Sequence, residues 1–290
     1  MRLREIFTSR RKAPAPKQEP LHLQVLFPQP VWLSADALMG RLREFHPSLA
    51  QARAEIMTGA LIPGSDQLAQ LARVWWDKHR VHIGFFPEPM PPGMLEQNID
   101  FALYDEGLKA RARAHTAHAV LVYKGEEKDP LEQYGVLAKI VAALVQLGAI
   151  VAVNPNGFTS YPAHDLTAHP GEDLDEVLRT LPLMALFVGF ARFTVEGYPG
   201  IWIRTTGAPL LDLPDLAMHT RDHEDVAHAF LMFKNIFAAM RDSGVKFKEG
   251  DMVDDGERQW KFRKPRSKEQ FLYSSRMIVL ERDPNGIRLP

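Results

Sequence analysis

The stretch that decides the fold lies near the middle of the chain and reads AHAVLVY (117–123), KGEEKDP (124–130), LEQYGVLAKIVAALVQL (131–147), GAIVAV (148–153) and NPNG (154–157). Its first and fourth segments are short and apolar, as buried strands are, and the third carries apolar residues at helical spacing. The other two segments have the charged, proline- and glycine-containing composition of turns. With the residues up to 161, the stretch predicts a β-α-β-β unit. It contains no phosphate-binding glycine loop, no nucleophile elbow and no paired carboxylates.

Outside this unit, helix and strand signals mix without the strict βαβα order of a doubly wound sheet. The patterns predict a helix capped by Ser34, helices over 66–77, 94–114, 163–181 and 223–241, and strands over 21–27, 81–86, 183–195, 201–205, 259–263 and 276–281. A turn at 197–200 links two of these strands as a hairpin. We therefore expect an α+β fold with mixed or antiparallel sheets and packed helices, built from β-α-β-β type units.

The length of 290 residues is large for one compact core and favours two lobes. We expect a flexible, basic and proline-rich tail over residues 1–20, an N-terminal α+β lobe over 21–162 and a C-terminal α+β lobe over 163–290. The tail carries Ile6 and Phe7, which would anchor it if it bound a surface. A solvated tail is the preferred interpretation, because the apolar face is short.

Composition excludes several classes of protein. A net charge of −1 gives no global field to attract nucleic acid or anionic lipid, and a chain with no cysteine has neither disulfides nor thiolate chemistry. The most apolar stretch, 136–153, is interrupted by Lys139 and falls short of the roughly 20 apolar residues of a membrane span. We therefore expect a cytoplasmic protein with no membrane span and no cofactor.

Four short stretches together resemble the bacterial domain of unknown function 4261 family. They are FPEPMP (86–91), AHTAHAVLV (114–122), RTTG (204–207) and LPDL (213–216). The resemblance would cover most of residues 21–282. It implies a bacterial protein with a shared α+β fold, and it supplies no reaction and no catalytic residues.

The candidate binding site from the sequence is the RTTG element with the acidic residue that follows it. Arg204 can grip a carboxylate or phosphate in a bidentate way, and the side chains of Thr205 and Thr206 and the amide of Gly207 add hydrogen-bond donors. Asp215 would orient the arginine or face a basic group of a partner. The alternative is a structural Arg204–Asp215 bridge that fixes the loop, and we consider it slightly more favoured.

Histidines offer only weak metal candidates. The HEDVAH sequence starting at His223 is one residue longer than the zinc motif, so on a helix its two imidazoles would lie about 140° apart around the axis. Asp222 is expected to cap that helix, which leaves His219 before it. His219 and His223 remain the only pair that we retain, and we expect no metal.

A basic segment over 258–268 interleaves Trp260 and Phe262 with cations, a pattern that can bind nucleic acid. The same alternation is typical of a half-buried strand, which is the preferred interpretation, and nucleic-acid binding through this segment is kept as an alternative function. No common enzyme motif occurs in the chain, and an enzyme is the less favoured class. We expect a non-catalytic binding or adaptor protein that acts on another protein, for example a toxin or secretion component. The alternative is a hydrolase or transferase with its site near Arg204.

Overall fold

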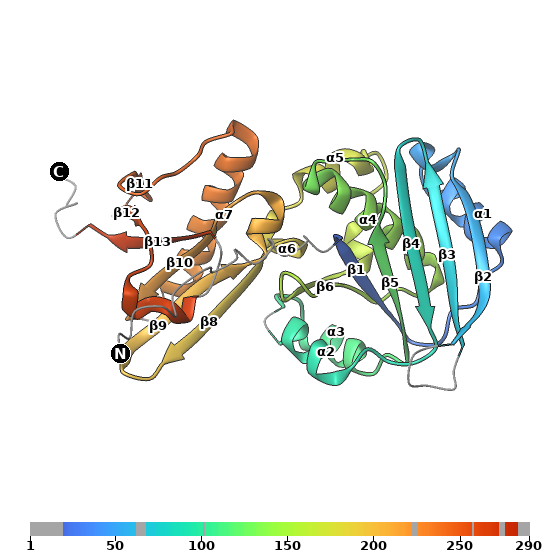
Figure 1. Ribbon diagram of the computed structural model, residues 1–290, viewed down its shortest axis with the longest axis horizontal. Coiled ribbons are helices and arrows are strands. Elements are labelled where there is room, and N and C mark those ends of the chain that lie inside the picture. Colours follow the sequence, from blue (N-terminus) through green and yellow to red (C-terminus); the bar gives the residue numbers. More distant parts are fainter. Residues whose placement is uncertain are drawn as a thin grey trace, which may run out of the picture.

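The computed structural model describes residues 20–61, 68–100, 102–221, 225–256, 258–272 and 276–283. Two β-sheets, each with its own helices, form two lobes that lie side by side (Figure 1). Neighbouring strands in the described residues are antiparallel, except for β10 and β13, which run parallel. The α+β fold with mostly antiparallel sheets and packed helices is confirmed.

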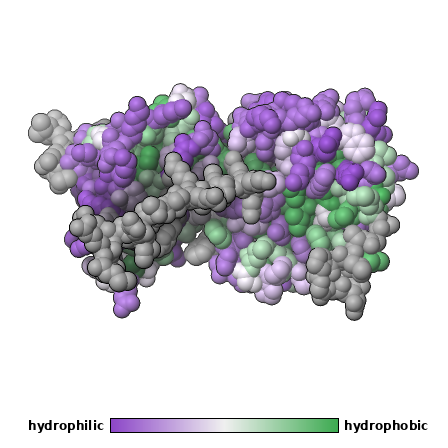
Figure 2. All heavy atoms as spheres, viewed as in Figure 1, coloured by the Kyte–Doolittle hydropathy of each residue, from purple (hydrophilic) through white to green (hydrophobic). Residues whose placement is uncertain are grey.

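The first lobe contains a seven-stranded sheet of order β2-β3-β4-β5-β1-β6-β7. Its strands are β1 (His22–Phe27), β2 (Arg53–Leu61), β3 (Leu68–Trp76), β4 (His79–Phe86), β5 (Ala117–Tyr123), β6 (Val151–Asn154) and β7 (Thr159–Pro162). Strand β1 lies between β5 and β6, and its side chains from Leu23 to Phe27 are buried on both faces. Hydrophobic residues also reach the surface of this lobe (Figure 2), and Met57 of β2 is 37% exposed.

Helices cover both faces of this sheet. One face carries α1 (Ala35–Phe45), the 3₁₀ helix η1 (Pro47–Leu49), α4 (Pro130–Leu144), η2 (Val145–Leu147), η3 (Ala163–Leu166) and α5 (Leu174–Thr180), and the other carries α2 (Pro92–Ile99) and α3 (Glu106–Arg113). Successive residues of a strand point to opposite faces. Val25 therefore belongs to the core under α4, whereas Leu26 packs with Leu95 and Ile99 of α2.

The second lobe contains a six-stranded sheet of order β11-β12-β13-β10-β9-β8. Its elements are α6 (Leu183–Leu186), β8 (Gly189–Val195), β9 (Tyr198–Thr206), η4 (Ala208–Leu211), β10 (Asp215–Thr220), α7 (Asp225–Ser243), β11 (Met252–Asp254), β12 (Gln259–Arg263), η5 (Ser267–Leu272) and β13 (Met277–Arg282). One face packs Ile203 against Phe233 of α7, and the other packs Trp202 against Leu272 of η5. The long helix α7 crosses one side of this lobe in Figure 1.

The two lobes share one hydrophobic core. A single cluster of buried side chains includes residues of both sheets, and Tyr134 of α4 stacks on Phe187 with ring centroids 5.1 Å apart. Buried Asn154 links the lobes, because its Nδ2 donates to the carbonyls of Leu186 and Phe187 at 3.0 and 3.2 Å. The boundary after residue 162 stays a prediction, but η3 and α5 pack on α4 of the first lobe.

Three glycines bring the backbones of the lobes into contact. A Cβ on Gly189 of β8 would lie 1.7 Å from the carbonyl oxygen of Gly157, and a Cβ on Gly207 would lie 3.0 Å from the Cα of Gly157. Gly207 also has a φ of +93°, which side chains other than that of glycine rarely tolerate. The RTTG element therefore needs its glycine for close packing at the junction.

Two predicted elements are wrong. Residues 66–77 were expected to form a helix, because Leu68, Leu71, Ala72 and Trp75 recur at helical spacing, but β3 occupies most of this range. The buried residues of β3 include Ala72, Val74 and Trp76, which alternate as in a strand, and pairing with β2 and β4 overrides the helical spacing. The start of the strand expected at 183–195 is instead the short helix α6, which follows Pro182.

Strands β2, β10 and β11 were not expected. Residues 53–61 form β2 at the edge of the first sheet, and Asp215 begins β10, which lies between β9 and β13. The LPDL stretch had been placed before a helix, but a strand follows it directly. Of their partners, β13 is distant in sequence from β10, whereas β3 follows β2 and β12 follows β11 closely along the chain, so only β10 depends on a partner that local patterns do not reveal.

None of the helices in the described ranges is long and apolar enough to cross a membrane. The tail over residues 1–20, with Ile6 and Phe7, falls almost wholly outside the described residues, and so does the expected capping residue Asp222. Helix α7 is described from Asp225.

Candidate functional site

An apolar cavity of about 270 Å³ lies between the two lobes. We call it the interlobe cleft. Its walls come from the α2–α3 connection, the β6–β7 hairpin, α6, β8 and α7, and its apolar side chains include Leu103, Phe158, Met184, Phe190 and Phe230. Binding sites form preferentially in such apolar hollows where two lobes meet. The cleft is therefore the first place in the described chain to look for a ligand.

Phe158 adopts an unusual backbone conformation at the mouth of the cleft. Its φ is +51°, in the left-handed region, which an aromatic residue rarely adopts and which costs about 1–2 kcal/mol. Its side chain nevertheless remains 45% exposed, so little burial offsets this cost. The turn is closed by bonds from the amides of Gly157 and Phe158 to the carbonyls of Asn154 and Pro155. Such strain at an exposed aromatic residue points to a functional role.

The turn that carries Phe158 is held in place by buried neighbours. Asn154 accepts a hydrogen bond from the hydroxyl of Tyr134 at 3.3 Å, and both side chains are fully buried. Burial raises the pKa of Tyr134 to about 12, so the hydroxyl remains a donor at every physiological pH. With Gly157 packed on the backbone of Gly189, the position of Phe158 is fixed by its neighbours rather than by its own contacts.

One polar group of the cleft wall is a hydroxyl pair. Tyr104 and Ser160 lie 3.0 Å apart between their hydroxyl oxygens, and Ser160 donates to the carbonyl of Asn98 at 2.8 Å. Desolvation raises the pKa of Tyr104. Because Ser160 donates to Asn98, its oxygen accepts from Tyr104, and the tyrosine proton is already used within the wall.

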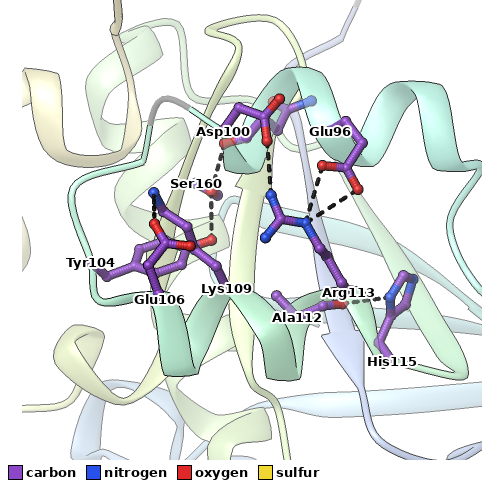
Figure 3. A network of polar contacts seen from close by, with 10 residues as sticks. Glu96, Asp100, Tyr104, Glu106, Lys109, Ala112, Arg113, His115 and Ser160 are labelled. Atoms are coloured by element: carbon purple, nitrogen blue, oxygen red, sulfur yellow. Dashed lines mark hydrogen bonds and ion pairs between the residues drawn. The ribbon is translucent and has the colours of Figure 1, made fainter.

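The α2–α3 wall is braced by ion pairs on its outer side. Arg113 of α3 lies between Glu96 and Asp100 of α2, at 3.1 and 2.8 Å, as Figure 3 shows. These residues are partly exposed, and such pairs contribute only about 0–1 kcal/mol each. Their role is to fix the angle between the helices, and hence the position of Leu103 and Tyr104 at the cleft.

The rim of the cleft carries one charge of each sign. Lys234 of α7 and Asp165 of η3 both line it and are exposed, and His164 lies 2.8 Å from Asp165. Leu103 is 76% exposed beside them. The cleft thus offers aromatic and aliphatic contacts inside and polar contacts at its edge. That composition suits binding, and none of the described residues that line the cleft is a histidine that could act as a base.

The structure places the predicted RTTG site next to the cleft but facing away from it. Thr205 pairs across the strands with Phe190, which lines the cleft, so Arg204 lies on the opposite face of β9. Burial lowers the pKa of Arg204, and the charge of Asp215 opposes this shift. The Nε of Arg204 donates to the carbonyl of Thr205 at 3.2 Å.

Asp215 and Thr205 form a buried structural pair. Asp215 is 3% exposed and accepts from the Thr205 hydroxyl at 3.3 Å and from the amide of Ala208 at 3.2 Å. The Thr205 oxygen in turn accepts from the amide of Leu216 at 2.8 Å. This network joins β9, η4 and β10, and it favours the interpretation of the motif as a structural link. Thr206 ends β9, and Gly207 packs on Gly157 as described above.

The retained histidine pair is only half described. His219 lies on β10, where its Nε2 donates to the carbonyl of Pro199 at 3.1 Å and its ring packs on Trp202. His223 lies outside the described residues. The other histidines near the fold centre are bonded to backbone: buried His115 accepts from the amide of Met90, and His118 donates to the carbonyl of Glu88.

The basic segment over 258–268 is a partly buried strand with paired charges. Trp260 and Phe262 are buried, at 4% and 0% exposed, so neither can stack on a base. Arg263 pairs with Glu269 and Glu281, and Arg266 pairs with Glu281. These contacts match the alternation expected of a half-buried strand. Nucleic acid would need exposed aromatic rings and available cations, and here the two rings are buried and both arginines are paired.

One cluster of polar side chains was not anticipated from the sequence. The ligand-capable atoms of His46, Asp173 and Asp175 lie within 4.8 Å of one another, and Lys139 reaches the same place from α4. A metal ion fits poorly there, because the ammonium of Lys139 already pairs with Asp175. Lys139 had been read only as an interruption of an apolar helix, and a lysine inside such a run is the signal that could have revealed it.

Comparison of the chain with protein-family models, with curated proteins and with solved structures gives no match. The resemblance to the bacterial domain of unknown function 4261 family therefore stays a prediction, and the functional argument comes from the geometry alone.

Proposed function

We propose that this is a binding or adaptor protein, with the interlobe cleft as a non-catalytic site that takes an apolar segment of a partner protein. The observation that carries the proposal is Phe158, an aromatic residue held at a φ of +51° with its side chain 45% exposed at the mouth of an apolar cavity. Folding alone gains little from this arrangement. The free-energy cost of the left-handed backbone at Phe158 is understandable if the ring is presented to a ligand.

The surroundings support a protein ligand. Exposed Leu103 continues the apolar surface beyond the cavity, and Lys234 and Asp165 supply polar contacts at its edge. Protein interfaces have this composition, with aromatic and aliphatic anchors at the centre and polar groups around them. The proposal of a bacterial, cytoplasmic setting rests on the lack of cysteine and on the family resemblance.

The two alternatives have weaker support. A hydrolase or transferase site at Arg204 would need the Asp215 carboxylate, which is already engaged by Thr205 and Ala208. Nucleic-acid binding by 258–268 would need the aromatic rings that are buried there.

A random peptide library selected on the purified protein tests the proposal. We expect enrichment of peptides with clustered large apolar residues. Their affinity should fall at least about tenfold, which is about 1.4 kcal/mol, in a Phe158→Asn variant, because an anchoring aromatic contact is lost. Asparagine tolerates the left-handed backbone, so this variant should keep the fold.

Two exposed leucines provide a matched control. Leu103 lines the cleft and is 76% exposed, whereas Leu231 is 57% exposed on α7 and does not line it. Leu103→Ser should weaken the selected peptides, and Leu231→Ser should not. Equal effects of the two substitutions, or full affinity in Phe158→Asn, would remove the cleft as the binding site.

A further inference from the structure

Several hydrogen bonds meet at the hydroxyl of Ser48, among the helices of the first lobe. Ser48 lies in η1, directly after α1, and is exposed. The Nζ of Lys139 donates to its Oγ at 2.8 Å, across a long separation in sequence. The Nδ1 of His46 lies 2.8 Å from the same Oγ.

The direction of these bonds is set by the backbone. The amide of Ser48 donates to Nδ1 of His46 at 3.2 Å, so this nitrogen carries a lone pair and not a proton. Because Lys139 donates to Oγ, the hydroxyl proton of Ser48 is directed at Nδ1, whose one lone pair it shares with the Ser48 amide. The imidazole of His46 can therefore accept the serine proton, and the ammonium of Lys139 binds the serine oxygen. This arrangement activates a nucleophile.

Two carboxylates complete the surroundings of the imidazole. Asp173 and Asp175 lie beside His46, and their charge favours the protonated ring that forms when it takes the serine proton. Burial and the nearby charge of Lys139 outweigh the effect of the two carboxylates and lower the pKa of His46. The ring is therefore neutral at pH 7. The neutral ring carries its proton on Nε2, which further disfavours a metal at this position.

A cavity of about 190 Å³ adjoins Ser48. Trp76, Leu131, Val136 and Leu178 give it apolar walls, and His79 also lines it. Two ion pairs offset most of its charge, because Lys139 binds Asp175 and Arg179 lies 3.4 Å from Glu132, and the remaining charged residue of its lining, Asp77, is acidic and disfavours an anion. The cavity therefore suits a small uncharged group rather than a phosphate or a polyanion.

We infer that Ser48 is the nucleophile of a second, catalytic site that hydrolyses small uncharged carboxylic esters, with His46 as its base. Oγ attacks the carbonyl carbon while its proton passes to Nδ1 of His46, and the ammonium of Lys139 stabilises the developing negative charge. The carbon–oxygen bond to the alcohol then breaks, and the alcohol leaves with the proton from His46. Water, deprotonated by His46, attacks the acyl-serine, and the carboxylic acid leaves as Oγ regains the proton.

The test uses the full-length protein with p-nitrophenyl acetate and with a fluorophosphonate label located by mass spectrometry. We expect the label on Ser48, and at least a tenfold loss of labelling and hydrolysis in Ser48→Ala. Ser243→Ala, a change of an exposed serine at the end of α7, should leave both unchanged. Ser48 is exposed, so its replacement should not unfold the protein.

The pH dependence supplies an independent readout. Hydrolysis should fall as the pH drops through the lowered pKa of His46, with a midpoint below 6.5, and His46→Gln should remove this limb. The charged and titratable groups around the ring are Lys139 from α4, Asp173 and Asp175 from α5, and His169 and Glu172 from the connection before it. Labelling elsewhere in a folded protein, unchanged hydrolysis in Ser48→Ala, or stoichiometric zinc that is lost in His46→Gln would each overturn the inference.

Discussion

The junction between the lobes has a closed part and a hollow part, and one turn contributes to both. At Gly157 the turn meets Gly189 and Gly207 backbone to backbone, with no room for a Cβ. One residue later Phe158 stands half exposed at a cavity of about 270 Å³. The hollow is therefore not the result of loose packing between the lobes, because the adjacent contact is as tight as a protein allows. The contrast indicates that the cleft is part of the fold and not a packing defect.

The closed part should be the more sensitive of the two. Gly189→Ala would place a Cβ 1.7 Å from the carbonyl oxygen of Gly157, where neither backbone can yield without separating the lobes. We expect a loss of about 3 kcal/mol or more in the free energy of unfolding, measured by urea denaturation. Gly40→Ala in α1 is the matched control. Nothing lies near its added Cβ, so it should stabilise the protein by about 0.5–1 kcal/mol. A Gly189→Ala protein as stable as the control would show that the lobes are not held at this contact.

The polar link beside the glycines should come next in effect. Asn154→Ala leaves the buried hydroxyl of Tyr134 and the carbonyls of Leu186 and Phe187 without their amide partner. We expect a loss of about 1–3 kcal/mol in denaturant unfolding. A loss below about half a kcal/mol would mean that water replaces the side chain and that the link contributes little to the junction.

A substitution in the hollow part should leave stability unchanged or increase it, in contrast to those in the closed part. Phe158→Asn relieves the positive φ at a position where the ring is 45% exposed, so stability should not fall and should rise by up to about 1 kcal/mol. Thermal and urea unfolding measure this directly. A loss of about 2 kcal/mol or more would show that Phe158 belongs to the core, and the reason for treating the cleft as a presented surface would then fail.

The sequence predicts much of the fold because local patterns were strong where the strands are buried. The AHAVLVY segment is β5 with the predicted bounds, and the NPNG turn joins β6 and β7. Strand β3 was missed, because its leucines and tryptophans fall at helical spacing although its neighbours hold it extended. Pairing with β2 and β4, the strands next to it in sequence, decided that case, whereas β10 also pairs with the distant β13.

The candidate site was harder to predict. The RTTG motif directed attention to the junction, but its polar groups serve the fold, and the cleft is made by residues from five separate segments. Phe158 follows a turn motif that predicts its backbone bend and says nothing of the cavity beside it. Ser48 and His46 were missed because Lys139, the residue that completes their cluster, lies on another helix.

The most direct test of the binding proposal is a titration of the protein, labelled at its methionine methyl groups, with a peptide selected as described above and followed by NMR. Met184 lines the cleft, whereas Met277 is buried with Leu272 on the far face of the second sheet. The proposal predicts a saturable shift of the Met184 signal with no change at Met277. Saturation of binding with Met184 unchanged would contradict it.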